Sequence, residues 1–245
     1  MIFFVIPAYN EEGNLEPLFR KIAQAMNQAK FAYKIIVVND GSTDKTQIII
    51  DRMSSQLPIY PLKNEVNQGL GFTISKGLKK AAEISSNGDI IVTMDGDGTH
   101  DPEYVQQFIT KISEGAQVVV ASRFVQGSGQ RGVSFLRKFL SQGAGFLLKL
   151  FFPTKGLNDY TCGFRAFQAN LVKDAFKTFG KDFIRERGFA ATPEILIKLR
   201  HLKAKVEEVS FTLKYDLKIG KSKIRIAKTI VQYLRMIARF KIKGY

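Results

Sequence analysis

The chain has 245 residues, and its 45% hydrophobic content is enough for a folded core, which excludes an intrinsically disordered protein. Its formal net charge of +15 predicts an anionic partner, which can be nucleic acid, anionic lipid or a phosphorylated substrate. The charge is uneven. Residues 1–110 hold 10 Lys and Arg against 13 Asp and Glu, and residues 111–245 hold 27 against 9, giving −3 and +18.

Cysteine content and hydropathy exclude further classes. Cys162 is the only cysteine, so the chain forms no intramolecular disulfide, and with two histidines it cannot build a zinc cluster. The N-terminal MIFFVI lacks a basic start, and no uncharged apolar run reaches the roughly 18 residues that span a bilayer. We therefore expect a cytoplasmic protein without a spanning segment.

The first half of the chain is typical of an α/β domain. Three short apolar runs predict buried parallel strands: IFFVIP, KIIVVND and GDIIVTMD. Helical patterns cover residues 14–28, 44–54 and 71–84 between them. Because ligands bind beyond the carboxyl ends of such strands, we expect three polar clusters to converge there: PAYNE (7–11), NDGS (39–42) and DGD (95–97).

The stretch VTMDGDGTHDPE (92–103) places two acids after the third strand. Asp101 before Pro102 is typical of a helix N-cap, but Asp95 and Asp97 come too early for that role. On a strand, residues two apart point to the same side, so these carboxylates repel unless a cation lies between them. Mg²⁺ or Mn²⁺, which prefers oxygen ligands, would relieve the repulsion by bridging them to a diphosphate.

After a strand predicted over residues 116–122, the second half contains two basic amphipathic helices, one over residues 133–152 and one in the C-terminal tail. In the tail, Arg225, Lys228, Arg235 and Arg239 lie on one side of a helical wheel, opposite Ile226, Ile230, Leu234, Ile237 and Phe240. A boundary near Gly220 separates a main domain, 1–220, from this helix, 221–245. Each helix can pack on the core or lie on a membrane surface, and two of them in the basic half favour the membrane.

Several motifs occur in an order typical of one enzyme family: FFVIPAYNEEGNL, IIVVNDGSTDKT, NQGLGFTISKGL, IIVTMDGDGTHDPE, ASRF, LNDYTCGFRAF and GKSKI. In these motifs the chain resembles the family 2 glycosyltransferases, and within them the polyprenyl-phosphate sugar transferases of the dolichyl-phosphate mannose synthase group. The resemblance covers nearly the whole chain. It implies the GT-A fold, a mostly parallel central sheet flanked by helices, and a nucleotide-diphosphate sugar as the donor.

The resemblance also assigns donor and metal residues. It implies that the donor nucleotide is bound by Pro7, Tyr9, Glu11, Val38, Asp40, Asp95 and Gly96. Asp95 and Asp97 would meet Mg²⁺ or Mn²⁺. The mannose synthases have a metal-binding Gln two residues after the second Asp, whereas this chain has Thr99. The third ligand is therefore open among Thr99, His100 and water.

The acceptor phosphate would be met by cations of the second half. Arg123 of ASRF matches an arginine near the donor and acceptor phosphates, and Lys223 matches the lysine of the family's Gly-x-Ser-Lys. The family's arginine just before that motif is missing, and Lys218 is the nearest cation. Arg165 and Glu194 also lie at family-like positions, where they can equally form an internal ion pair.

The reaction implied is an inverting transfer of a hexose to a polyprenyl phosphate at the cytoplasmic face of a membrane, with Asp97 and Arg123 as catalytic residues. A glycan or lipid-linked sugar hydroxyl is the alternative acceptor, and it would require a general base such as Asp159. A basic nucleic-acid-binding protein is the third reading. The acidic strand ends and the lack of a recognisable binding motif speak against it, so we expect no nucleic acid partner. The sequence does not choose among GDP-mannose, UDP-glucose and UDP-N-acetylhexosamine.

Overall fold

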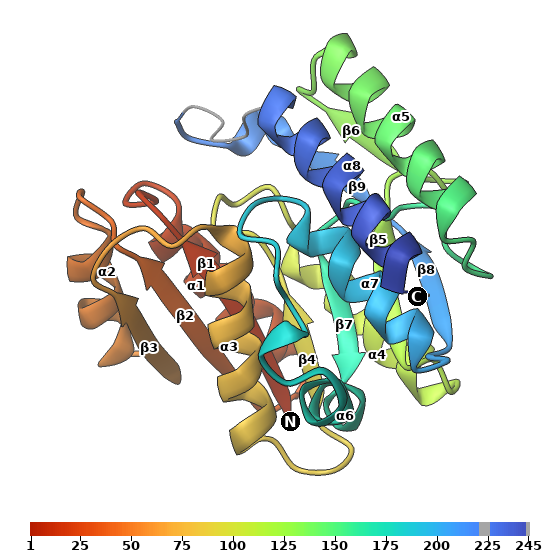
Figure 1. The fold of residues 1–245 in the computed structure, drawn as a ribbon. Coiled ribbons are helices and arrows are strands. Elements are labelled where there is room, and N and C mark those ends of the chain that lie inside the picture. The colour runs from red at the N-terminus through yellow and green to blue at the C-terminus, as the bar shows by residue number, and fades with distance from the viewer. Residues whose placement is uncertain (221–225, 244–245) are drawn as a thin grey trace.

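The structure is a computed structural model that describes residues 1–220 and 226–243 (Figure 1). The first half contains β1 (Ile2–Ala8), α1 (Leu15–Gln28), β2 (Tyr33–Asp40), α2 (Thr46–Ser54), β3 (Ile59–Asn64), α3 (Leu70–Ile84), β4 (Ile90–Thr93), η1 (Pro102–Tyr104) and α4 (Val105–Ser113). The second half contains β5 (Val118–Ser122), β6 (Gly129–Arg131), α5 (Phe135–Phe151), β7 (Arg165–Gln168), α6 (Ala169–Phe179), η2 (Gly180–Asp182), α7 (Ala191–His201), β8 (Val206–Ser210), β9 (Thr212–Lys214), η3 (Tyr215–Leu217) and α8 (Ile226–Lys243).

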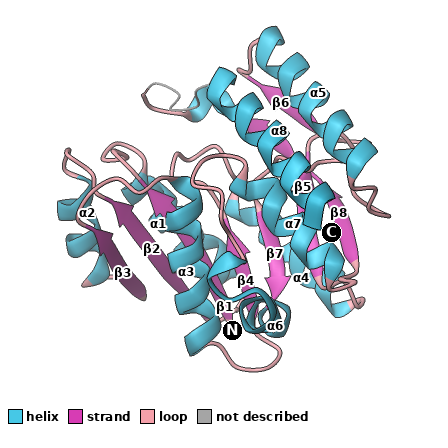
Figure 2. Ribbon diagram, in the orientation of Figure 1, coloured by secondary structure: helices cyan, strands magenta, loops and turns pink. Residues whose placement is uncertain are grey.

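The main sheet has the strand order β3-β2-β1-β4-β7-β5-β8. All neighbouring strands pair in parallel except β7, which is antiparallel to both β4 and β5. Helices cover both faces, with α3 and α6 on one and α1 and α4 on the other (Figure 2). The predicted α/β fold with a mostly parallel sheet is confirmed.

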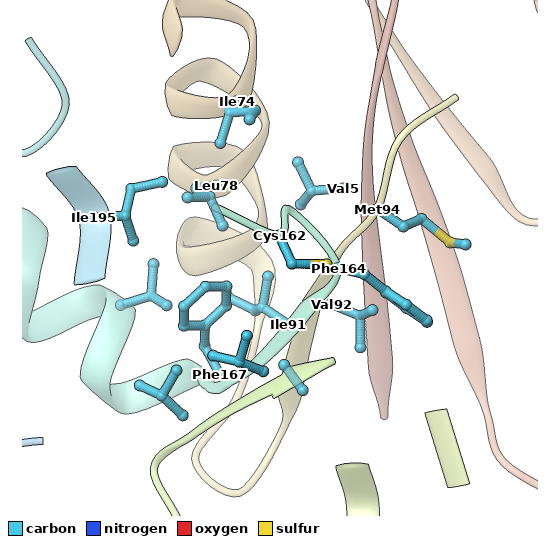
Figure 3. Close-up of a cluster of buried hydrophobic side chains, with 14 of the residues drawn as sticks. Val5, Ile74, Leu78, Ile91, Val92, Met94, Cys162, Phe164, Phe167 and Ile195 are labelled. Carbon is cyan, nitrogen blue, oxygen red and sulfur yellow. The ribbon is translucent and has the colours of Figure 1, made fainter. Parts of the chain in front are cut away.

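The core lies where the sheet meets these helices. Val5 of β1 and Ile91 of β4 are fully buried, and Leu78 of α3 packs over them (Figure 3). Phe167 of β7 and Ile195 of α7 belong to the same buried cluster (Figure 3). The apolar runs of the sequence are continuous rather than alternating because these strands are buried on both faces.

The sheet topology positions the site. β1 pairs with β2 on one side and β4 on the other, so the chain order reverses at β1 and opens a crevice at the carboxyl ends of β1 and β4. The PAYNE and DGD clusters follow these two strands. A small parallel pair, β6 with β9, lies outside the main sheet.

The two amphipathic helices lie beside each other in the second half (Figure 1). The inner face of α8 contributes Tyr233, Met236, Ile237 and Phe240 to the core, and Phe240 packs edge-on against Phe152. Of the predicted apolar face, Ile230 and Leu234 stay 43% and 53% exposed, so the helix is rotated from its simple wheel. Within the described residues, no helix is long and apolar enough to cross a bilayer.

Candidate active site

The acid pair lies in the turn after β4, not on the strand, because β4 ends at Thr93. Strand alternation therefore does not orient Asp95 and Asp97, contrary to the sequence argument. Both nevertheless line one cavity of about 240 Å³. Asp97 is buried, whereas the side chain of Asp95 is 43% exposed. The two carboxylates thus occupy different environments within one site.

Asp97 is held by hydrogen bonds on both carboxylate oxygens. Its Oδ1 accepts from the Thr99 hydroxyl at 2.7 Å and the Thr99 N–H at 3.2 Å, and its Oδ2 accepts from Lys218 Nζ at 2.6 Å. Burial alone would raise the pKa of Asp97, but the Lys218 ammonium lowers it below its usual range. Asp97 is therefore kept as a carboxylate.

Asp95 contacts the His100 ring through its backbone and its side chain. The Asp95 N–H donates to His100 Nδ1 at 3.1 Å, and His100 Nε2 lies 3.8 Å from Asp95 Oδ2. In the neutral ring this places the proton on Nε2, so neither nitrogen has a lone pair left for a metal. The imidazole is buried and stacked on Phe164. Although the Asp95 side chain is partly exposed, the protein around its carboxylate raises the pKa of Asp95, His100 opposes the rise and Asp97 adds to it. This arrangement disfavours His100 as the third ligand.

Gly96 allows the acid turn to approach β1. A Cβ at this position would lie 2.9 Å from the Pro7 carbonyl oxygen and 3.3 Å from the Leu15 side chain. The group that approaches Gly96 most closely is the end of β1. This contact fixes the acid pair beside the PAYNE loop.

The PAYNE and NDGS loops brace each other. The Asn10 N–H donates to Ser42 Oγ at 2.9 Å, and the Thr43 N–H donates to Asn10 Oδ1 at 2.8 Å. The Glu11 N–H donates to Thr46 Oγ1 at 2.8 Å, which ties the end of β1 to α2. Tyr9, in the same loop, is half-buried. The structure therefore brings the first two polar clusters together, as predicted.

The other nucleotide candidates have structural contacts as well. Asp40 accepts hydrogen bonds from Asn64 Nδ2 at 2.8 Å and from the N–H groups of Gln68 and Gly69, both at 2.9 Å, so its carboxylate shapes the loop before α3. The Val38 side chain is fully buried in the core under α3. Pro7 is partly exposed at the end of β1.

Arg123, directly after β5, is clamped by a fully buried carboxylate. Asp159 Oδ2 accepts from Arg123 Nε at 2.7 Å and its Oδ1 from Nη2 at 2.8 Å, while Nη2 also donates to Thr161 Oγ1 at 2.6 Å. The N–H groups of Thr161 and Cys162 donate to Asp159 as well. Burial alone would raise the pKa of Asp159, but Arg123 and the backbone donors lower it. Among the described residues, Arg123 Nη1 donates no hydrogen bond, and Arg123 lines the cavity.

Residues 214–219 cross the acid turn as a strap. The Lys214 N–H donates to the Thr99 carbonyl at 3.4 Å, and Lys214 Nζ donates to Asp101 at 2.7 Å. Lys218 reaches Asp97, and Ile219 exchanges two hydrogen bonds with the Asn14 side chain at 3.1 and 3.3 Å. Lys218 therefore meets the acid pair. Lys223, the other predicted phosphate ligand, lies outside the described residues.

Residues of α5, α8 and several loops complete the cavity, and spacing along the chain did not identify them. The lining includes Val133, Leu140, Ser141, Ala144, Thr161, Thr229, Ile230 and Tyr233. Most of these side chains are apolar. The amphipathic patterns pointed to both helices, but no local signal brings residues 141 and 233 to one site.

Arg165 and Glu194 have structural roles. Arg165 is buried and donates to the carbonyl oxygens of Thr192 at 2.6 Å and Tyr160 at 2.8 Å. Glu194 is fully buried and forms ion pairs with Lys198 at 3.2 Å and Arg239 at 2.7 Å. The sequence left open whether Glu194 is a site residue or part of an internal ion pair, and the structure shows the internal ion pair. Arg165 instead bonds to backbone oxygens.

The fold is the GT-A fold of nucleotide-sugar transferases. The glucosyl-3-phosphoglycerate synthase of Mycobacterium tuberculosis, crystallised with Mg²⁺ and uridine diphosphate, matches with a TM-score of 0.66. The match covers 97% of this chain and 79% of that chain at 18% sequence identity, so it shows the fold alone.

Residues 3–176 match the model of glycosyl transferase family 2, and the chain belongs to this family. The resemblance predicted from the motifs is confirmed. The chain is 34% identical over 236 residues to a dolichol-phosphate mannosyltransferase of Pyrococcus furiosus, covering 96% of this chain and 62% of that relative. It is 27% identical over 246 residues to a dolichyl-phosphate β-glucosyltransferase of Trichomonas vaginalis, covering 96% of this chain and 69% of the relative.

Proposed function

We propose that this protein transfers a hexose from a nucleotide-diphosphate sugar to a polyprenyl phosphate at a membrane surface, in a reaction that depends on Mg²⁺ or Mn²⁺. The observation that carries the proposal is one cavity lined both by charged groups, Asp95, Asp97, Arg123 and Lys218, and by apolar side chains of α5 and α8. A polyprenyl phosphate needs both kinds of surface. The names of the two relatives support the same acceptor class.

The donor nucleotide would lie in the crevice between the PAYNE and NDGS loops, with its diphosphate at the acid pair. The braced loops and the position beyond the carboxyl ends of β1 and β4 support this placement. The fold neighbour crystallised with uridine diphosphate and Mg²⁺ is consistent with a nucleotide at this edge.

The residues fit a divalent ion that is bound mainly through substrate oxygens. Asp95 and Asp97 offer carboxylates, and the Thr99 hydroxyl keeps lone pairs while it donates its hydrogen to Asp97. Within the described chain, no three His, Cys, Asp or Glu residues gather as a metal site. Such a sparse protein set suits Mg²⁺, which keeps phosphate and water ligands. When bound, the ion supplies positive charge that stabilises the departing diphosphate.

The chemistry requires cations more than a base. An oxygen of the acceptor phosphate forms a bond to the anomeric carbon while the bond from that carbon to the diphosphate breaks, and the nucleoside diphosphate leaves with the electron pair. Attack opposite the leaving group inverts the anomeric configuration. Arg123 and Lys218 neutralise the two phosphate groups that must approach each other. Because the acceptor is already ionised, no proton has to be removed from it.

The environment of Asp159 supports a phosphate acceptor over a hydroxyl acceptor. A general base needs a free lone pair directed at the substrate and a pKa near the working pH. Asp159 is fully buried, has a lowered pKa and is surrounded by donors from Arg123, Thr161 and Cys162. It is better suited to positioning Arg123 than to accepting a proton.

An exposed apolar stripe on α5 supports docking to a membrane surface. Phe135, Phe139, Phe146 and Leu150 are 62% to 84% exposed and recur at helical spacing on one side. On the neighbouring α8, Leu234 and Ile242 are also exposed. A stripe of this kind in the basic half of the chain fits an anionic bilayer surface, where apolar insertion and charge attraction add.

The test is transfer to lipid. Purified protein is incubated with polyprenyl phosphate, Mn²⁺ or Mg²⁺, and radiolabelled GDP-mannose, UDP-glucose or UDP-N-acetylglucosamine in separate reactions. We expect one donor to give an organic-extractable product, and chelation of the metal to abolish it. Failure to label lipid with every donor of a full panel, in a preparation that binds nucleotide, would refute the acceptor assignment.

A further inference from the structure

Tyr233 is a buried residue of α8 that lines the cavity of the candidate active site. Tyr233 is only 8% exposed, and it belongs to the hydrophobic core cluster. It also lines the same cavity as Asp95, Asp97 and Arg123. A helix more than 100 positions after Arg123 in the chain therefore reaches the site of reaction.

The phenol lies among the charges of the Arg123 clamp. Burial raises the pKa of Tyr233 to about 12, with Arg123 and Arg165 opposing the rise and Asp159 adding to it. Tyr233 and Arg123 line the same cavity, so the phenol and the guanidinium share one site. At neutral pH the group stays protonated and is a hydrogen-bond donor.

Two donors remain available there. Within the described residues, no hydrogen bond involves the Tyr233 hydroxyl, which leaves it able to donate to a ligand in the cavity. Arg123 uses Nε and Nη2 on Asp159 and Thr161, which leaves its two Nη1 hydrogens for a ligand. A phosphate oxygen is an acceptor suited to both donors, because hydrogen bonds to an ionised group are short and strong.

Tyr233 also marks the boundary between polar and apolar lining. Ile230, one helical turn before it on α8, and Leu140 and Ala144 on α5 provide apolar surface for a lipid chain. Arg123 and Lys218 provide the charge. A phosphate attached to an apolar chain would meet Tyr233 at the junction of the two.

We propose that the Tyr233 hydroxyl, together with Arg123 Nη1, binds the phosphate of the lipid acceptor, so that α8 completes the acceptor site. This assignment rests on the proposed function and specifies its acceptor contacts. The same helix exposes Leu234 next to Tyr233, so adjoining sides of one element would serve membrane docking and acceptor binding.

The test compares a phosphorylated lipid with its alcohol. Calorimetric binding of farnesyl phosphate and of farnesol is measured for the wild-type chain and for Tyr233→Phe, which keeps the ring. We expect Tyr233→Phe to lose about tenfold in affinity for farnesyl phosphate and nothing for farnesol. Tyr60→Phe, on the edge strand β3 and 37% exposed, is the matched control and should bind both lipids like the wild type.

The outcomes separate this proposal from the proposed function. Wild-type binding that does not distinguish the phosphate from the alcohol would overturn the acceptor class itself. If the wild type prefers farnesyl phosphate and Tyr233→Phe shows the same preference, the acceptor class stands and the Tyr233 contact is wrong. Equal weakening of both lipids in Tyr233→Phe would reduce Tyr233 to a packing residue and also overturn the contact.

Discussion

At the scale of single residues, the buried Arg123–Asp159 ion pair holds a guanidinium group in a fixed position at the cavity. Taking both charges out of water is costly, and this cost is offset only when geometry and hydrogen bonds are complete. Asp159 meets this condition with donors from Arg123, Thr161 and Cys162. The fixed guanidinium then presents Nη1 to the cavity without reorganisation during the reaction.

Removing the negative charge of this pair should lower the stability of the folded protein. Asp159→Asn leaves the Arg123 guanidinium buried without its counter-ion, so we expect the free energy of unfolding to fall by about 3–5 kcal/mol. Urea denaturation followed by circular dichroism measures the change. The control is Asp216→Asn, which breaks an exposed pair with Arg131 at 3.4 Å and should cost less than about 1 kcal/mol. Equal effects from the two variants would contradict the buried-pair argument.

The difference between wild type and Asp159→Asn should depend on pH. The pKa of Asp159 is lowered on folding, so its ionisation stabilises the fold fully above the unfolded pKa of about 4, and this stabilisation is lost as pH falls toward the folded pKa. We therefore expect the stability gap to be constant near neutrality and to shrink in acid. A gap that is unchanged down to the acid limit of folding would mean that the carboxylate charge is not what stabilises the pair.

Lys218 should compete with a divalent ion for Asp97. Its ammonium lies 2.6 Å from the carboxylate that would face the metal. Lys218→Met removes this competitor, so we expect Mn²⁺ binding in the absence of nucleotide to tighten on the order of tenfold, while transfer to lipid slows. Paramagnetic resonance titration measures the binding. Lys214→Met, which removes a cation paired with Asp101, is the control, and weaker Mn²⁺ binding in Lys218→Met would refute the competition.

At the scale of elements, α5 and α8 divide their faces between core and surface. α8 buries Met236, Ile237 and Phe240, whereas α5 leaves Phe139 and Phe146 exposed. The sequence left core packing and membrane binding open as alternatives for each helix. Arg239, which the helical wheel placed on the basic side, pairs with Glu186 and Glu194 and attaches α8 to the domain.

The exposed stripe of α5 gives a direct test of docking. Phe139→Ser with Phe146→Ser removes two large apolar groups from the surface, each contributing about 1.5–3 kcal/mol when buried. We expect binding to anionic liposomes to weaken at least tenfold in a sedimentation assay, with nucleotide binding unchanged. Phe72→Ser, on α3 and 45% exposed, is the matched control. Unchanged partitioning of the double variant would exclude this stripe as the docking surface.

The elements were predictable where burial and periodicity agree. β1, β2 and β4 were apparent because both faces of each are buried, and α1, α2 and α3 were predicted within two residues at either end. β3 was missed because IYPLKN contains Pro61, which is tolerated since β3 is an edge strand. β7 was missed because its pairing between β4 and β5 joins segments far apart in sequence.

In the candidate site, too, local sequence patterns were predictable and contacts between distant segments were not. The clusters at strand ends follow local patterns, so the sequence was sufficient to place Asp95, Asp97 and Glu11 at one edge of the sheet. The differing environments of the two acids were not, because they depend on His100 within the turn and on Lys218, 121 positions after Asp97. Tyr233 gave no signal, since on a helical wheel it is one more apolar residue.

At the scale of the whole molecule, the acidic first half and the basic second half contain different sets of candidate site residues. The net charge of −3 in residues 1–110 accompanies the nucleotide and metal candidates, and the +18 of residues 111–245 accompanies the acceptor cations and the exposed helices. An anionic lipid surface would attract the second half and not the first. Under the proposed function, this charge distribution would orient the cavity, which residues of α5 and α8 help to line, toward the bilayer.

Although the sequence favoured a separate tail, the packing of α8 predicts that it is part of the folded unit. Ending the chain at residue 220 removes the fully buried Met236 and Phe240, each contributing about 1.5–3 kcal/mol, and leaves Glu194 without Arg239. We expect the truncated chain to lose several kcal/mol of unfolding free energy or to be unfolded, as urea denaturation would show. The control is Leu234→Ser with Ile242→Ser on the outer face of α8, which should keep the wild-type midpoint and weaken only liposome binding. A truncated chain with the wild-type midpoint would establish α8 as an independent appendage.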